Sequence, residues 1–464
     1  MGEFDRASFK DPEGRVFERD GRIYRTLSEA ARARMQTLFD DGILPPLIEE
    51  GLVIPSRLIP ARQAALDPTI YGAVVMEHAR IPVITYPYEW SFDMLRAAAL
   101  LTLDLLMRCL DHDLILKDAT AFNVALVKGR MRLIDVLSID HYQDGQPWDG
   151  YSQFCREFLF PLMLTAYKGV AFQPWLRSSL TGIQAGDLAR LFGPRDLFRP
   201  GVFKHVVMQA KLERSFADQD LELRRSFMQA KIGKNMIRAN LARLASIILG
   251  MRPRQQDSAW IGYTADSPYS DAEEEMKRAF VAHALDEAGS RRVIDLGANT
   301  GAYSVVAAAQ ADLVISADMD PACVDVLFRR VGNQPDGAKL VPMVLDLTNP
   351  SPSQGWALAE RKDLFERLQT DAFLALALVH HICIGGNVPL DQFVALLARM
   401  GRAGVVEWID KEDEMVQRLL RNRVDIFSDY SWSAFTTALD RHFEIQYTRE
   451  SHGGRRRLCF VTAR

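Results

Sequence analysis

The stretch from Arg291 to Tyr303, RRVIDLGANTGAY, limits more than any other what this chain can fold into. An apolar run reaches Asp295, and Gly297 and Gly301 then lead into the small-residue segment YSVVAAAQA. A short buried strand, a glycine turn and a helix start predict a nucleotide-binding βα unit. A second predicted strand, DLVISAD, ends at Asp318, about 20 residues beyond the first glycine, where Rossmann-like units place a carboxylate on ribose hydroxyls.

Strands and helices alternate through the rest of residues 271–464. The predicted strands are RRVIDLG, DLVISAD, KLVPMVLD, DAFLALALVHH and AGVVEWID, followed by HFEIQYTRE and RRRLCFVTAR. Continuous apolar strands separated by helices are typical of a parallel sheet that is covered on both faces. The last two strands are joined by a Gly-Gly turn, which predicts an antiparallel pair at the end of a Rossmann-like α/β fold.

The glycine spacing indicates which ligand this fold binds. Pyrophosphate binding favours G-x-G-x-x-G, whereas this chain has Asp295-Leu-Gly297-Ala-Asn-Thr-Gly301. This segment, together with the final antiparallel pair, resembles the class I methyltransferases that use S-adenosylmethionine (SAM), over residues 271–464. The resemblance implies SAM as the cofactor, with Asp295, Gly297, Asn299 and Gly301 lining its methionine end.

The same resemblance assigns the next two strand ends to the nucleoside. Asp318 would accept hydrogen bonds from the ribose hydroxyls, Met319 would flank the adenine, and Asp346 would meet the adenine amino group. Each acid has an alternative interpretation as a helix cap or turn residue, but all three follow consecutive predicted strands, at the edge where open α/β sheets bind ligands. Upstream, Trp260 and Tyr263 are further candidates for closing over the cofactor.

The methyl acceptor is expected beyond the fourth strand, in ALVHHI. Methyl transfer requires acceptor, methyl and sulfur to lie in line, and a hydroxyl acceptor must also lose a proton. His380 or His381 is the candidate base, and the alternative is that one histidine packs while the other faces the cleft. Glu407 and Trp408, ending the fifth strand, are secondary candidates. The expected acceptor is a small molecule or glycan, methylated on oxygen. The absence of the Asn/Asp-Pro-Pro-Tyr motif of DNA amino methyltransferases counts against a base-modifying enzyme.

The N-terminal half contains a second motif, in LILKDATAFNVALVKGRMRLIDVLSID. Asp118 and Asn123 have the spacing D-x-x-x-x-N, and Asp135 follows a strand-like segment. This resembles the catalytic segment of protein kinases and aminoglycoside phosphotransferases. The resemblance implies that Asp118 orients an acceptor hydroxyl while Asn123 and Asp135 hold magnesium on ATP. A strand-rich lobe, with SFKD, RVFERDG and RIYRTL as its first strands, and a buried helix before the motif fit that order.

Several parts of a kinase site are missing. The turn Pro12–Gly14 is the nearest candidate for a glycine-rich phosphate loop and is too short. Arg25 stands where the ATP-binding lysine is expected, Leu116 replaces the usual histidine, and Glu29 is only a tentative helix partner. Three interpretations stay open: a kinase-like domain that does not phosphorylate, a competent one that binds ATP and magnesium, and an unrelated helical domain with a chance motif.

Composition sets the remaining limits. The chain has 464 residues, of which 48% are hydrophobic and 25% charged, and a net charge of −4, so no DNA partner is expected. Its longest apolar segment, Met94–Leu110, carries charges and is too short for a membrane span. Five scattered cysteines without a C-x-x-C pair predict reduced thiols, a cytoplasmic protein and no metal site.

The predicted domains are a kinase-like domain at 1–249, a linker at 250–270 and the methyltransferase domain at 271–464. Residues 195–254 are rich in Lys and Arg, which predicts either a surface for anionic partners or a solvated helix face. The oligomeric state stays open.

The layout of YPYEW, LKDATAFN, IDVLS and LVHH resembles a family of bacterial methyltransferases that includes nodulation-associated proteins. Three hypotheses follow for the whole chain. The first is a methyltransferase with a kinase-like scaffold or acceptor-binding domain. The second is a bifunctional enzyme that phosphorylates and methylates one acceptor. The third is a non-catalytic protein that senses SAM or a nucleotide.

Overall fold

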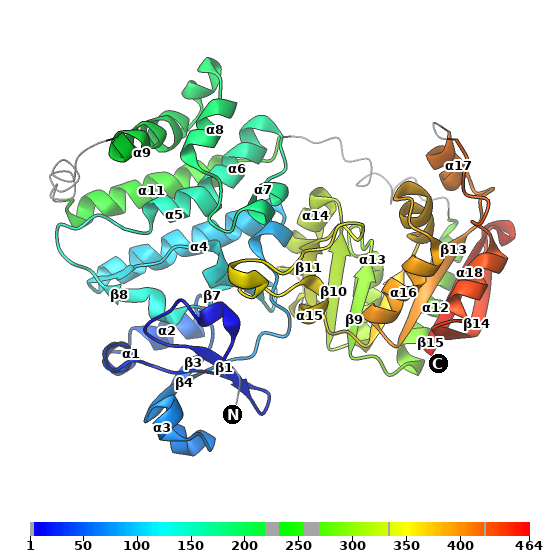
Figure 1. Cartoon of the computed structure of the whole chain (residues 1–464), viewed down its shortest axis with the longest axis horizontal. Helices are drawn as coiled ribbons and strands as arrows, with labels where there is room; N and C mark the ends of the chain where they lie inside the picture. The colour runs from blue at the N-terminus through cyan, green and yellow to red at the C-terminus, as the bar shows by residue number, and fades with distance from the viewer. Residues whose placement is uncertain (1–3, 219–231, 255–268, 333–334, 422–423) are drawn as a thin grey trace. The chain divides into compact units, whose positions relative to one another are not determined.

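The computed structural model describes residues 4–218, 232–254, 269–332, 335–421 and 424–464. The chain divides into two compact units, whose elements are labelled in Figure 1. The N-terminal unit comprises Met1–Gln256 and the short segment Gln354–Arg361, and the C-terminal unit comprises Asp257–Ser353 and Lys362–Arg464. The chain therefore returns once to the N-terminal unit, a return that was not predicted from the sequence.

The boundary between the units falls within residues 250–270, the range predicted as a linker. Residues 255–268 lie outside the described residues, and so do the cofactor-closing candidates Trp260 and Tyr263. The described part of this range resumes at Tyr269 and Ser270, which lead directly into the first helix of the C-terminal unit.

The N-terminal unit starts with a small antiparallel sheet in the order β1-β2-β4-β3. Its strands are β1 (Val16–Arg19), β2 (Arg22–Arg25), β3 (Ser56–Pro60) and β4 (Val74–His78). The segment SFKD (8–11), predicted as a further strand, instead begins in a 3-10 turn at Arg6–Ser8 and continues as a turn. This turn forms because the Asp5 side chain accepts the Ala7 N–H at 2.8 Å, and the Ser8 hydroxyl donates to the Asp5 carbonyl at 2.8 Å.

The rest of the N-terminal unit is mostly helical. The predicted helix at 94–110 is α4 (Phe92–Asp111), whose buried side chains are mainly Leu, Ala and Met. The basic helix α11 (Lys234–Gly250) pairs Lys234 with Asp113 and Arg238 with Asp111. The other elements are α1 (Glu29–Asp40), α2 (Leu44–Glu49), α3 (Pro68–Tyr71), β5 (Leu114–Leu116), β6 (Val124–Val127), β7 (Arg130–Leu133), β8 (Ile139–His141), α5 (Tyr151–Phe154), α6 (Phe160–Met163), α7 (Gln173–Ser178), α8 (Ala185–Leu191) and α9 (Met208–Asp218).

The C-terminal unit contains a seven-stranded sheet in the order β11-β10-β9-β12-β13-β15-β14. The first five strands in this order are parallel, and β15 and β14 run antiparallel at one edge. This confirms the predicted Rossmann-like fold with its terminal antiparallel pair. The strands are β9 (Arg292–Leu296), β10 (Leu313–Asp318), β11 (Leu340–Val344), β12 (Ala372–Ala375), β13 (Ala403–Ile409), β14 (Phe443–Ser451) and β15 (Arg456–Ala463).

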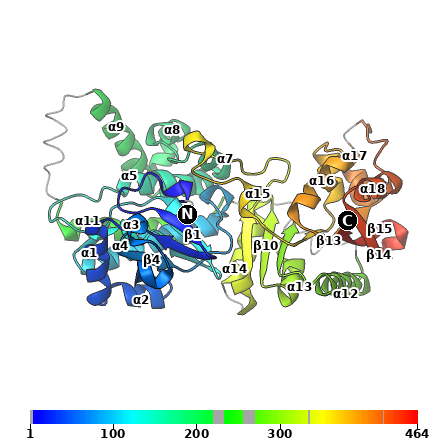
Figure 2. The same cartoon turned by 60° about the horizontal axis from the view of Figure 1, so that its bottom comes forward.

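Helices cover both faces of this sheet (Figure 2). The residues of β12 and β13 are all buried, as their continuous apolar sequences predict. The first helix begins with a capping box, in which Ser270 accepts the Glu273 N–H and the Glu273 carboxylate accepts the Ser270 N–H at 3.0 Å. The helices are α12 (Asp271–Glu287), α13 (Ala302–Gln310), α14 (Pro321–Val331), α15 (Leu364–Arg367), α16 (Leu390–Met400), α17 (Glu414–Leu420) and α18 (Trp432–Leu439).

Two predictions about the whole chain concern its apolar helices and its thiols. Among the described residues, no helix has both the length and the apolar character that crossing a membrane requires. All five cysteines lie in the described part of the chain, where each is buried and free of a disulfide.

Gly301 determines how the first strand of the C-terminal unit leads into its helix. It stands directly before α13 and adopts φ +83°, a left-handed conformation. A Cβ atom at this position would lie 2.4 Å from Cδ1 of Leu327 on α14. Both the backbone conformation and the close packing of the two helices therefore require glycine.

We predict that Gly301→Ala lowers the free energy of unfolding by about 2–4 kcal/mol, the sum of left-handed strain and overpacking. Gly289→Ala is the matched control, because Gly289 also has a positive φ of +59° but nothing lies within 4 Å of an added Cβ. The control should lose only about 1–2 kcal/mol. Urea unfolding followed by tryptophan fluorescence measures both values, and equal losses would contradict the packing argument.

Candidate functional site

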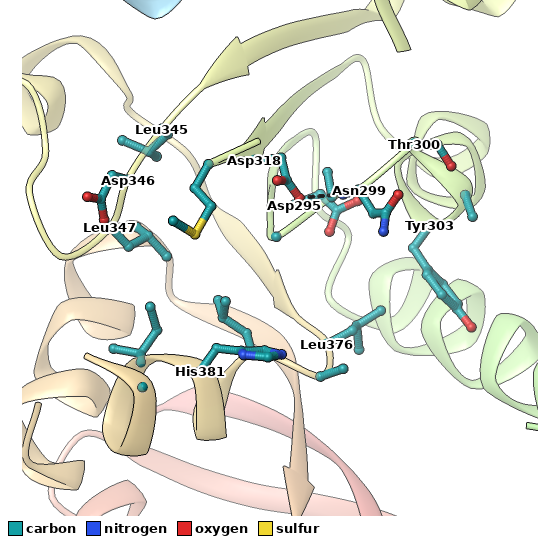
Figure 3. Close-up of a pocket in the computed structure, with 18 of the residues that line it drawn as sticks. Asp295, Asn299, Thr300, Tyr303, Asp318, Leu345, Asp346, Leu347, Leu376 and His381 are labelled. Carbon is teal, nitrogen blue, oxygen red and sulfur yellow. Dashed lines mark hydrogen bonds between the residues drawn. The ribbon is translucent and has the colours of Figure 1, made fainter. Parts of the chain in front are cut away.

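A cavity of about 380 Å³ lies at the carboxyl ends of the parallel strands in the C-terminal unit (Figure 3). The loops that follow β9, β10, β11 and β12 all contribute to its wall. Gly301 and His380 are not among the lining residues, whereas seven of the nine residues predicted for the cofactor and catalysis are: Asp295, Gly297, Asn299, Asp318, Met319, Asp346 and His381.

Asp295 lies near the end of β9 and is buried, with 2% of its surface exposed. Its carboxylate accepts a hydrogen bond from the Ser304 hydroxyl of α13 at 2.6 Å. Burial raises the pKa of Asp295 to about 6, although the Ser304 hydrogen bond favours the ionised form. The carboxylate is therefore charged above about pH 6, where it can attract a cationic group.

Gly297 gives the first turn its open inner surface. It adopts φ +73°, and an added Cβ would lie 3.3 Å from Cδ1 of Leu378 on the opposite wall of the cavity. A side chain here would therefore occupy space that the cavity now offers to a ligand.

Asp318, at the end of β10, connects the first turn to the second strand. Its carboxylate accepts the Asn299 N–H at 2.7 Å and the Asp320 N–H at 2.8 Å. Asn299 adopts φ +51°, an uncommon conformation for a residue other than glycine, and this hydrogen bond holds it there. Burial raises the pKa of Asp318, and the backbone N–H groups oppose that change. Figure 3 shows Asp295, Asn299 and Asp318 grouped on one side of the cavity.

Met319 and Asp346, which follow β10 and β11, also line the cavity. Met319 keeps 63% of its surface exposed. Asp346 accepts both the N–H of Thr348 at 2.9 Å and its hydroxyl at 2.6 Å. Asp346 is therefore a turn residue, as one alternative proposed, and also a cavity residue.

The two histidines follow β12 and have different surroundings. His381 lines the cavity, whereas His380 is fully buried and neither of its ring nitrogens has a hydrogen-bond partner in the described structure. Burial lowers the pKa of both, to about 4 for His381. Both are therefore neutral at pH 7, and of the two only His381 is placed to accept a proton from a ligand in the cavity.

Glu407 and Trp408 do not lie on the acceptor side of the cavity, so that prediction was wrong. Both are fully buried, and neither belongs to the cavity lining. Trp408 stacks on Tyr430 and Phe435, with ring centroids 4.4 and 4.9 Å away. Because β13 is covered on both faces, its side chains pack inside the unit instead of entering the cavity.

Three lining residues at the start of the C-terminal unit were not predicted from the sequence: Tyr269, Glu274 and Lys277. One signal was available. The buried residues of α12 include Lys277, Val281, Ala284 and Leu285, so a lysine occupies the apolar face of the helix. A charge at such a position is uncommon unless it has a buried partner.

In the N-terminal unit, the four residues predicted from the kinase resemblance lie near one another. Arg25 is 6% exposed, and its guanidinium donates to Asp135 and, at 2.5 Å, to Asp11. The Asn123 amide donates to Asp135 at 3.3 Å. Burial raises the pKa of Asp118, and the charge of Asp135 adds to this effect.

The turn predicted as the nearest phosphate-loop candidate carries a second ion-pair cluster. Glu13 accepts two hydrogen bonds from Arg34 of α1, at 2.9 and 2.7 Å, and one from Lys117. The Arg34 hydrogen bond is the main cause that lowers the pKa of Glu13 to about 2. Glu29, the tentative helix partner, is exposed at the start of α1. Glu13 in this turn therefore pairs with Arg34 and Lys117, and Asp11, just before the turn, pairs with Arg25.

Comparison with solved structures gives several weak likenesses. The methyltransferase domain of bacterial CtHen1-C is 12% identical (41% of this chain and 98% of that one, TM-score 0.31). Magnesium protoporphyrin IX methyltransferase from Synechocystis PCC 6803 is 15% identical (42% and 84%, TM-score 0.30). N-methyltransferase NodS from Bradyrhizobium japonicum WM9 is 9% identical (42% and 98%, TM-score 0.31). Scores this low carry no inference, and the fold assignment rests on the strand order itself.

No protein-family model matches the chain. By contrast, the nodulation protein NoeA of Rhizobium meliloti (strain 1021) is 38% identical over 457 residues, which cover 97% of this chain and 94% of NoeA. The similarity thus extends over both units. The chain belongs to the family of nodulation protein NoeA, and its C-terminal unit has the fold of a class I SAM-dependent methyltransferase.

Proposed function

We propose that the C-terminal unit transfers a methyl group from SAM to an oxygen atom of a small-molecule or glycan acceptor. The observation that carries this proposal is the single cavity into which Asp295, Asp318 and Asp346 come from the ends of three adjacent strands. SAM, when bound, supplies an activated methyl group.

The residues of this chain would bind and orient the donor. The open turn at Gly297 admits the methionine end, and the Asp295 carboxylate is placed for its ammonium group. Asp318 and Asp346, at successive strand ends, are placed for ribose and adenine. Apolar residues of the wall, including Leu345, Leu376 and Ile382, would exclude water from the reacting atoms.

His381 is the proposed general base. It is neutral at pH 7 because burial lowers its pKa, so a ring nitrogen is available to accept a proton. The acceptor hydroxyl would lose its proton to His381 as its oxygen takes the methyl group. His380 packs behind it, with the two ring centroids 4.1 Å apart, and would limit the orientations open to the His381 ring.

The test is mass spectrometry of bacterial extract incubated with the full-length chain and SAM that carries an isotopically labelled methyl group. We expect a small molecule or glycan to gain the label, and His381→Gln to lower the rate by about 10²–10⁴-fold, the usual contribution of general base catalysis. Donor binding by His381→Gln should stay within about twofold of wild type, a factor worth only about 0.4 kcal/mol. Donor binding without any labelled product would favour a sensor protein instead.

The charge of Asp295 predicts a pH dependence for donor binding. Because burial raises its pKa to about 6, the carboxyl is protonated below that pH and cannot pair with the donor's ammonium group. Affinity for S-adenosylhomocysteine should therefore rise by up to about tenfold per pH unit as pH approaches 6 from below, then level off. Calorimetry between pH 5 and 7.5 measures this, and Asp295→Asn should bind weakly with a flat profile. An unchanged slope in the variant would exclude Asp295 as its source.

For the N-terminal unit we propose a scaffold or acceptor-binding role without phosphoryl transfer. The support is electrostatic, because Arg25 is already paired with Asp11 and Asp135, and Arg34 and Lys117 are paired with Glu13 and Asp140. ATP phosphates would have to displace these carboxylates and would meet their negative charge. The alternative is the bifunctional enzyme. The observation in its favour is that Asp118, Asn123 and Asp135 lie near one another.

ATP turnover separates these alternatives. We expect the full-length chain with magnesium and ATP to show no turnover above that of Asp135→Ala, with or without the extract that contains the methyl acceptor. Turnover that Asp135→Ala abolishes would instead support phosphorylation by this unit. Asp113→Asn is a suitable control, because the exposed Asp113 side chain pairs only with Lys234 among the described contacts and asparagine tolerates the left-handed φ of +55° at this position.

A further inference from the structure

Lys277 places a buried cation in the cavity wall. The residue is 3% exposed, yet it belongs to the lining. Its ammonium lies 2.7 Å from Oε2 of Glu407, and 4.7 and 4.9 Å from the ring centroids of Tyr269 and Tyr303. All of these contacts are made within the C-terminal unit, so the position of the cation is fixed by the methyltransferase fold alone.

Glu407 fixes the position of Lys277 and does not itself line the cavity. Its carboxylate accepts hydrogen bonds from the Lys277 ammonium, from the Ala377 N–H at 2.9 Å and from the Tyr269 hydroxyl. Ala377 lies two residues after the end of β12 and has φ +50°, so the chain leaving the strand presents its N–H to Glu407 in an uncommon conformation. Three donors keep the buried carboxylate in place, and Glu407 itself does not reach the cavity.

The lysine is not needed for packing alone. Replacing a buried ion pair with apolar residues is often neutral or stabilising, so stability gives little reason to place a charge here. An ammonium group has three N–H donors, and its one described hydrogen bond is to the Glu407 carboxylate, because the two ring faces at 4.7 and 4.9 Å attract the charge without accepting a conventional hydrogen bond. A donor therefore remains for an anionic group in the cavity.

We propose that Lys277 binds the α-carboxylate of the donor's amino-acid end, and that Glu407 is its positioning residue. This inference rests on the proposed function. Asp295 lines the same cavity, and the Lys277 charge acts on it, favouring its ionised form. An acid and a lysine at one end of a cavity match the two charges of an α-amino acid, the acid for its ammonium group and the lysine for its carboxylate.

The test compares two ligands that differ only in this carboxylate, SAM and decarboxylated SAM. Calorimetry of the full-length chain gives both dissociation constants for wild type and for Lys277→Met, which keeps the apolar stem. We expect Lys277→Met to weaken SAM binding by about tenfold or more, the value of one charge-assisted hydrogen bond. Binding of decarboxylated SAM should change by less than about twofold.

Two further variants serve as controls, one against misfolding of Lys277→Met and one against effects of removing any nearby cation. Lys277→Met/Glu407→Gln removes both buried charges and should show the same ligand-specific loss, which keeps the test valid if the single variant fails to fold. Arg278→Met is the matched control, because Arg278 is the next residue of α12 and also faces the Tyr303 ring, at 5.8 Å, but does not line the cavity. It should bind both ligands as wild type does.

Equal weakening for both ligands, or none for SAM, would overturn the assignment of Lys277 while leaving the proposed function intact. Failure of the wild type to bind either ligand would instead overturn the proposed function, and the Lys277 assignment with it.

Discussion

The hydrogen bond from the Asn299 N–H to the Asp318 carboxylate joins the turn after β9 to the end of β10, and the cavity depends on it. It holds Asn299 in a left-handed conformation, and Gly297 and Gly301 allow the chain to turn on either side of it. The turn and the strand end therefore face one ligand site together. Asp295, two residues before Gly297, is tied to the same region through Ser304 of α13.

Much of the C-terminal unit was predictable because its strands are buried on both faces. Such strands give continuous apolar runs, and their parallel order brings the residues that follow them to one edge of the sheet. This is why Asp295, Asp318 and Asp346 were identified from sequence. Gly301 was placed correctly in the turn, but it packs against Leu327 of α14 instead of lining the cavity.

The rest of the site depends on contacts between distant segments, which periodicity does not reveal. Lys277 is one charge in the run DAEEEMKR, and its buried partner Glu407 lies 130 residues away in sequence. A strand buried on both faces does not indicate which side a residue faces, so Glu407 was wrongly predicted to face the cavity, which it does not line. The sequence did not distinguish His380 from His381, because both were placed at the end of a predicted strand, whereas they lie in helical turns after β12.

In the N-terminal unit the D-x-x-x-x-N motif predicted which residues lie close together, but it did not predict which charged side chains surround them. Asp118, Asn123 and Asp135 were expected together, but the pairing of nearby cations with Asp11 and Glu13 was not, because Asp11 was predicted to end a strand and Glu13 to lie in a phosphate-loop turn. The C-terminal unit differs, because its cavity is bordered by acids and by one lysine whose partner is buried behind it. A ligand with both an ammonium and a carboxylate group fits that charge pattern, whereas phosphates do not fit the pattern around Arg25.

The most direct test of this account is a crystal structure of the full-length chain with S-adenosylhomocysteine. The account predicts ligand density in the cavity at the carboxyl ends of β9, β10 and β11, with the amino-acid end between Asp295 and Lys277 and the adenine beside Asp346. Density elsewhere, or a reversed ligand with adenine at Lys277, would contradict it.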